Sequence, residues 1–129
     1  MQSLSAISIL VHDYDAAIVW FTDKLGFVLT QDVDMGGAKR WVTMTPHADA
    51  QTSIVIARAT TPAQIAAIGN QHGGRVGFFL TVDNFDAAYQ AMLAMGVIFR
   101  ETPRSEPFGK VVVFEDCCGN GWDLLERTS

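Results

Sequence analysis

The chain contains an internal repeat, and this feature constrains its fold more than any other. Segment 82–88 (VDNFDAA) repeats segment 11–17 (VHDYDAA) at an offset of 71 residues. A repeat of this kind divides the 129 residues into two similar modules, and missing it would lead to the wrong fold. A module of half this length is too small to close a pocket by itself. We therefore expect both modules to contribute to any binding site.

Each module shows the same order of predicted elements. An alternating apolar strand is followed by a helix, capped by Asp13 or Asp15 in the first module and by Asn84 or Asp86 in the second. Gly26 and Gly96 mark the ends of these helices. A short capped helix is expected at 61–68, and turns are expected at 103–109 and 117–121. The predicted strands are 6–11, 27–34, 39–45 and 53–57, then 75–82, 97–100, 110–115 and 121–126.

Length and composition indicate a single globular domain. We expect module one at about 1–59, a connecting segment at about 60–73 and module two at about 74–129. The net charge of −5 disfavours nucleic acid and anionic membranes as partners. The chain has no stretch of about 20 apolar residues and no leader pattern at its N-terminus, so we expect a cytoplasmic protein.

The repeated residues resemble those of the vicinal oxygen chelate superfamily. This superfamily includes glyoxalase I, extradiol dioxygenases, fosfomycin-resistance enzymes and bleomycin-resistance proteins. The resemblance implies an α+β fold in which two tandem βαβββ modules form a curled, cup-shaped mixed sheet with helices outside, often completed by a homodimer. The matching residues are Val11, His12, Asp13, Ala16, Ala17, Trp20 and Phe21, then 24–27, 82–83, 85–88, 96–97, 114–116, 119–120 and 123–126.

In metal-dependent members, the resemblance implies one ligand from the first and last strand of each module, usually His, Glu or Gln. The matching positions here are Ala6, Val55, Gly77 and Asp123. A single carboxylate cannot hold a divalent metal against water, so we predict no metal and no cofactor. The three histidines, His12, His47 and His72, are expected in loops rather than at a metal.

Strand alternation places a mostly apolar set of side chains on the inner face of the cup. In this interpretation Ile7, Ile9 and Val11 face the helices. Aromatic walls with one acid suit an aromatic or cationic organic ligand. The predicted ligand-binding residues are Ser8, Leu10, Trp41, Val55, Gly77, Phe79, Phe108 and Asp123.

The roles of Asp123, of Trp41 and of the two cysteines each have an alternative interpretation. Asp123 is the tentative catalytic residue, as a general base whose pKa is raised by burial, but it could instead bond to backbone or to Arg40. Trp41 could stack on a ligand or lie in the core or a dimer interface. Adjacent Cys117 and Cys118 are interpreted as reduced thiols in a turn, with a redox or metal role as the alternative.

The leading functional hypothesis is a metal-independent, homodimeric small-molecule binding protein of the glyoxalase/bleomycin-resistance type. The alternative is a lyase, isomerase or dioxygenase of the same superfamily acting on a small organic substrate. A third possibility is an interaction module that functions through its dimer face. Fold resemblance alone does not choose among them.

Overall fold

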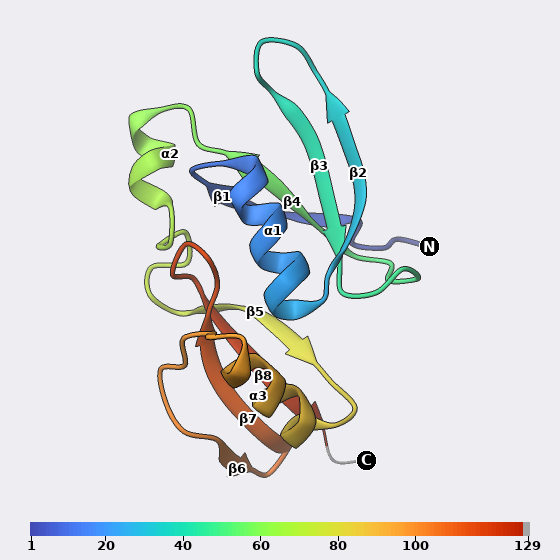
Figure 1. The fold of residues 1–129 in the computed structure, drawn as a ribbon, viewed down its shortest axis with the longest axis vertical. Helices are drawn as coiled ribbons and strands as arrows, with labels where there is room; N and C mark the ends of the chain where they lie inside the picture. Colours follow the sequence, from blue (N-terminus) through green and yellow to red (C-terminus); the bar gives the residue numbers. More distant parts are fainter. Residues whose placement is uncertain (128–129) are drawn as a thin grey trace. The chain divides into compact units, whose positions relative to one another are not determined.

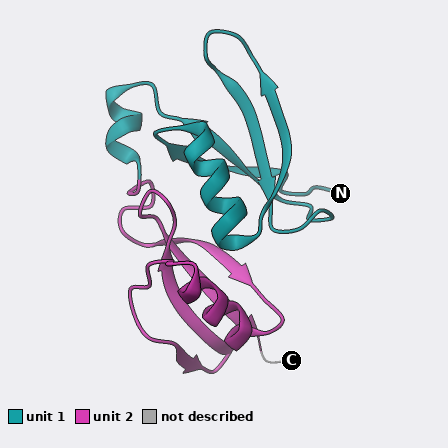
Figure 2. Cartoon of the chain, viewed as in Figure 1, with its two compact units in different colours: residues 1–68 teal, residues 69–129 magenta. Residues whose placement is uncertain are grey.

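The computed structural model describes residues 1–127 and contains the repeat as two four-stranded sheets. The residues group into two compact units, Met1–Ile68 and Gly69–Ser129 (Figure 2). The strand order is β1-β4-β3-β2 in the first sheet and β5-β8-β7-β6 in the second, which is the same topology twice. The two βαβββ modules predicted from the sequence are therefore confirmed, and the sheets and their helices can be followed in Figure 1.

In the first unit, β1 runs parallel to β4, while the β3–β4 and β2–β3 pairs are antiparallel. A β-hairpin at Gly36 and Gly37, both with positive φ, joins β2 to β3, as a two-glycine turn predicts. The elements of this unit are β1 (Ala6–Val11), α1 (Tyr14–Leu25), β2 (Val28–Asp34), β3 (Arg40–Thr45), β4 (Ser53–Arg58) and α2 (Pro62–Ala67).

The second unit repeats this pattern, with β5 parallel to β8 and the β7–β8 and β6–β7 pairs antiparallel. Its elements are β5 (Val76–Thr81), α3 (Phe85–Ala94), β6 (Arg104–Glu106), β7 (Gly109–Glu115) and β8 (Gly121–Arg127).

The structure decides which residues cap the two long helices. The Asp13 side chain accepts a hydrogen bond from the Ala16 backbone N–H at 2.8 Å, and Asn84 accepts one from Ala87 at 3.1 Å. The alternatives Asp15 and Asp86 lie in the first turn, where a negative charge favours the positive end of the helix dipole. Asp13 and Asn84 are the caps because their extended backbone directs each side chain toward the third N–H group of its helix.

One predicted strand was wrong. Residues 97–100 do not form a strand, and only an isolated bridge joins Phe99 to Phe114. The fourth strand of the second unit is instead β6, which lies inside the predicted turn at 103–109. The ladder with β7 ends at the pair Glu106 and Gly109, so two residues suffice to reverse the chain there. Pairing with β7 decided this strand, and no local alternation marked it.

Each sheet buries the face that its helix covers: α1 packs on the first sheet and α3 on the second. Ile9, Val11 and Phe21 are at most 1% exposed, which confirms the predicted direction of the first two. Ile7 is an exception because it is 39% exposed near the start of β1. None of the helices described between residues 1 and 127 is long and apolar enough to cross a membrane.

Candidate functional site

A groove of about 420 Å³ lies on the first unit. Residues of β1, β3 and β4 line it, together with residues of the β2–β3 hairpin, the start of α1, and α2 with the segment that precedes it. Four of the predicted ligand-binding residues line it: Ser8, Leu10, Trp41 and Val55. They come together because Ser8 pairs with Val55 across β1 and β4, with β3 next in the sheet. Their role in binding stays a prediction.

Trp41 presents a fixed aromatic ring to this groove. Its indole Nε1 donates a 2.8 Å hydrogen bond to Oε1 of Gln31 on the neighbouring strand. The residue remains 41% exposed, so it is not part of the core of its unit. Ring stacking is favourable for large planar groups, and a ring whose edge is already bonded loses little freedom on binding.

Arg40 organises one wall of the groove. Its guanidinium pairs with Asp15 at 2.9 Å and with Asp32 at 2.7 Å, and it lies 5.1 Å from the centre of the Tyr14 ring. The hydrogen bond from Arg40 is the main cause of the lowered pKa of Asp32. Its bonds to Asp32 and Asp15 raise the pKa of Arg40. The carboxylate partners of Arg40 are therefore Asp15 and Asp32.

The sequence interpretation missed two basic residues in the groove, Lys39 and Arg58. Within residues 1–127, no carboxylate forms an ion pair with either of them. The lining also contains Arg40 but no Asp or Glu. Alternation along β4 groups Arg58 with the buried Ile54 and Ile56 and not with Val55, so the strand pattern does not predict Arg58 in the groove.

In the second unit, Asp123 lies opposite Phe79 in the parallel pair β5–β8. Phe79 is 65% exposed, and the Oδ1 atom of Asp123 is buried without a hydrogen-bond partner. Burial raises the pKa of Asp123, with Arg104 acting in the opposite direction. The alternative partner Arg40 is not used, because its side chain bonds Asp15 and Asp32. The structure thus supports the predicted environment of the carboxyl group, and its catalytic role stays a prediction.

Gly77 and Phe108 complete the predicted set. The His72 ring occupies the space that a Cβ atom on Gly77 would need, at an irregularity between Val76 and Phe78 in the β5 pairing. His72 is thus packed against β5 and makes an edge contact with the Phe78 ring at 5.1 Å. Phe108 lies in the β6–β7 turn and is 45% exposed.

Comparison with known proteins identifies the family. A sequence model of the Glyoxalase/Bleomycin resistance protein/Dioxygenase superfamily matches residues 3–124. The chain belongs to this superfamily. A protein of Shewanella frigidimarina is 43% identical over 126 residues, which is 97% of this chain and 93% of the relative.

Solved structures of other proteins share the fold. UcmS2 has a TM-score of 0.84 and 30% identity, covering 97% of this chain and 98% of its own. TnmS3, an antibiotic binding protein from Streptomyces sp. CB03234, has a TM-score of 0.79 and 26% identity, covering 99% and 98%. The fold class and the resemblance predicted from the sequence are therefore confirmed.

The donor set does not fit the metal used by metal-dependent members of the superfamily. Strands β1, β4 and β5 contain no His, Asp, Glu or Gln. Moving a predicted ligand position by one residue along any of these strands therefore still gives no metal ligand. Asp123 is the single carboxylate at the four positions, since Ala6, Val55 and Gly77 carry no donor side chain. Divalent metals need several oxygen, nitrogen or sulfur ligands. We therefore derive no metal-dependent chemistry for these positions.

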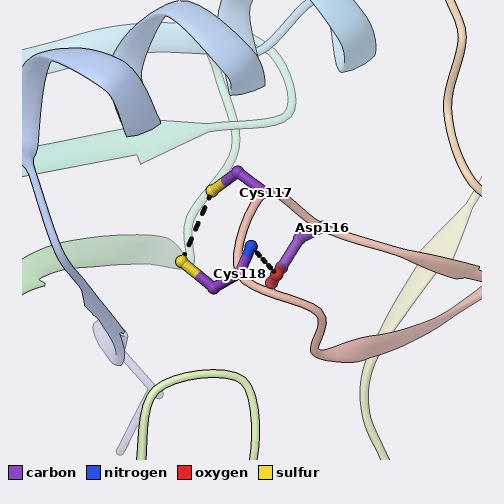
Figure 3. Close-up of side chains that lie close together, drawn as sticks. All are labelled: Asp116, Cys117 and Cys118. Atoms are coloured by element: carbon purple, nitrogen blue, oxygen red, sulfur yellow. Dashed lines mark hydrogen bonds between the residues drawn. The ribbon is translucent and has the colours of Figure 1, made fainter. Parts of the chain in front are cut away.

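The turn between β7 and β8 contains a second group of reactive side chains (Figure 3). The carboxylate of Asp116 is 6% exposed and accepts four hydrogen bonds, from the backbone N–H groups of Cys118 and Asn120 and from the side chains of Asn120 and Trp122. The two cysteine Sγ atoms are 3.8 Å apart and form no disulfide. The adjacent Cys118 thiol is the main cause of the raised pKa of Cys117, and burial adds to it.

Proposed function

We propose that this chain is a metal-independent binding protein for a planar aromatic small molecule, either uncharged or anionic, held in the groove of the first unit. The observation that carries this proposal is the oriented, exposed ring of Trp41 in a groove with two basic side chains, Lys39 and Arg58, that form no ion pair with a carboxylate of residues 1–127. An aromatic surface with a few placed polar groups is the usual composition of a small-molecule site.

The size of the groove supports a ligand of a few fused rings. Its volume of about 420 Å³ lies within the range of about 300–1,000 Å³ found for small-molecule pockets. Trp41 offers a stacking surface, and Leu10 and Val55 add apolar contact.

The charge of the groove favours an anion over a cation. Lys39, Arg40 and Arg58 line it, and among the residues that the structure describes carboxylates pair with Arg40 alone of the three. A cationic ligand, expected from the acidic composition, would meet like charges here, which costs binding energy. The net charge of the whole chain therefore predicts the local charge poorly, because most acidic side chains lie elsewhere.

The antibiotic-binding activity of TnmS3 supports binding without chemistry. In our proposal the ligand is held by stacking, apolar contact and charge, none of which requires a metal. An enzyme of the lyase, isomerase or dioxygenase type remains the alternative function. Asp123 would then be the candidate acid or base, since its raised pKa fits proton transfer.

The experiment compares two aromatic probes of similar shape and opposite charge, 2-naphthoate and 2-naphthylmethylammonium. Calorimetric titration is expected to give tighter binding of the anion, by about tenfold for one well-placed charge contact of about 1.4 kcal/mol. The preference should fall at high salt, because the basic groups are partly exposed.

Variants of the groove separate the two contributions. Trp41→Ala should weaken both probes, while Arg58→Gln should weaken only 2-naphthoate. Trp20→Phe is the matched control, since Trp20 lies in the same unit and does not line the groove. Tighter binding of the cation, or equal binding by the Trp41→Ala variant, would contradict the proposal. Turnover of a bound substrate that is lost in Asp123→Asn would favour the enzyme.

The homodimer is also a proposal, and so is a ligand-binding role for Gly77, Phe79, Phe108 and Asp123. Sedimentation equilibrium measures the oligomeric state. Protection of Phe79 and Phe108 from hydroxyl-radical labelling by 2-naphthoate would place them at the ligand. Unchanged labelling at saturating probe would limit the site to the first unit.

A further inference from the structure

The turn between β7 and β8 holds two thiols in a fixed arrangement. Cys117 and Cys118 point to the same side of the turn, with their Sγ atoms 3.8 Å apart (Figure 3). Cys117 is exposed and Cys118 is half-buried, so a small molecule can reach the pair from solvent. These are the only two cysteines of the chain, so any dithiol chemistry of the protein belongs to this turn.

The backbone of the turn is held on both sides of the thiols. Asp116 accepts hydrogen bonds from the backbone N–H groups of Cys118 at 2.9 Å and of Asn120 at 3.1 Å. The carbonyl group of Cys118 packs against Gly69, where a Cβ atom would collide with the carbonyl oxygen. Gly119 adopts a φ of 95°, a left-handed conformation that favours glycine. The spacing of the thiols is thus set by the turn and not only by their adjacency.

The nearby carboxylate cannot act as a third ligand without breaking this turn. An ionised carboxylate offers about four acceptor positions. In Asp116 both oxygens are used twice: Oδ1 by the two backbone N–H groups, and Oδ2 by the Asn120 amide at 3.0 Å and the Trp122 indole at 2.9 Å. A Zn²⁺ ion takes four ligands, so two thiols and an occupied carboxylate do not make a zinc site.

The spacing also disfavours a disulfide. A disulfide requires an S–S distance of about 2.05 Å with a restricted torsion, and adjacent cysteines at 3.8 Å would need a large local movement. A single soft atom that bonds to both sulfur atoms requires less movement, because the two sulfur atoms are then two bonds apart instead of one. The geometry therefore suits a soft centre that forms two bonds to sulfur and needs no further protein ligand.

We propose that Cys117 and Cys118 form a binding site for a trivalent organoarsenic compound of the arsenoxide type, R–As=O. Two S–As bonds form and the As=O group is lost. Its oxygen leaves as water with the two thiol protons, so the arsenic stays trivalent and no oxidant or reductant takes part. The site shares no residue with the groove of the proposed function and does not depend on that function.

The test uses phenylarsine oxide with the full chain, measured by intact mass spectrometry and by titration of protein thiols. We expect one phenylarsenic group per chain, with loss of one water and of both titratable thiols. The adduct should survive excess glutathione, a monothiol, and be removed by 2,3-dimercaptopropanol, a dithiol. An adduct that glutathione removes would overturn the proposal.

Two controls separate a built site from ordinary thiol reactivity. Cys117→Ser and Cys118→Ser each leave one thiol, and neither should form a glutathione-resistant adduct; circular dichroism confirms that they are folded. The native chain should also bind at least about tenfold more tightly than the chain in urea, because the turn preorganises the thiols. Equal affinity in the two states would show that adjacency alone is responsible, and would overturn the assignment of a folded site.

Discussion

The buried carboxylate of Asp116 is expected to be one of the largest single side-chain contributions to stability outside the apolar core. It accepts four hydrogen bonds from donors in the next six residues of the chain, and Asp116, Asn120 and Trp122 are at most 6% exposed. Replacement by alanine removes the acceptor and leaves the donors in place. Water cannot easily replace the acceptor for the two side-chain donors, because both residues are only 3% exposed.

The expected loss follows from those two donors. Each buried donor left without a partner costs about 1–3 kcal/mol, and hydrogen bonds to a charged group contribute more than neutral ones. Allowing for partial relaxation of the turn, Asp116→Ala should lower the free energy of unfolding by about 3–5 kcal/mol. This is a large share of the roughly 5–15 kcal/mol that stabilises a typical domain.

Urea denaturation followed by circular dichroism and tryptophan fluorescence measures this loss. Asp49→Ala is the matched control, because Asp49 is an exposed loop carboxylate, and the change there should stay within about 0.5 kcal/mol. Asp116→Asn keeps one acceptor oxygen, so its loss should be smaller than that of the alanine variant. If Asp116→Ala costs no more than Asp49→Ala, the hydrogen bonds of the turn do not stabilise the fold and our reasoning is refuted.

Two further predictions concern Asp123 and Gly109. The raised pKa of Asp123 means that the folded state holds this proton more tightly than the unfolded state, so stability should fall as pH rises through the interval from the ordinary aspartate pKa to the raised one. Asp123→Asn should therefore gain stability over the native chain across that interval, and a pH-independent difference in urea melts would contradict this. Gly109→Ala should destabilise strongly, because φ is 139° and a Cβ atom would collide with the Glu126 carbonyl oxygen, whereas Gly36→Ala, with φ of 84° and open space, should cost only about 1–2 kcal/mol in thermal or urea unfolding.

Local signals predicted most of the secondary structure. The alternation in 6–11 and the glycine at 26 marked β1 and the end of α1, because these depend on neighbouring residues. The error at 97–100 has the opposite cause: β6 exists because Arg104, Ser105 and Glu106 pair with β7. Three polar residues after a proline carry no strand pattern, so only the pairing partner reveals them.

The candidate site was only partly predictable for the same reason. Strand alternation placed Ser8, Leu10 and Val55 on one face, and the register of β1 and β4 brings them together in the groove. The basic lining of Lys39 and Arg58 was missed, because their position relative to the groove depends on the hairpin and on the end of β4. The charge of a pocket is set by the few side chains that converge on it, so it cannot be read from the total charge of the chain.

The sequence by itself determined the family, the duplicated βαβββ topology and the absence of metal-ligating side chains from three of the four expected strand positions. These properties follow from residue identity and spacing along the chain. Only the tertiary structure decided that the first-unit groove is basic, that Asp116 is saturated by four donors, and that two adjacent thiols are held 3.8 Å apart. Each of these features depends on which side chains and backbone groups the folded chain brings close together. Those distances are set by three-dimensional packing and do not follow from spacing along the sequence.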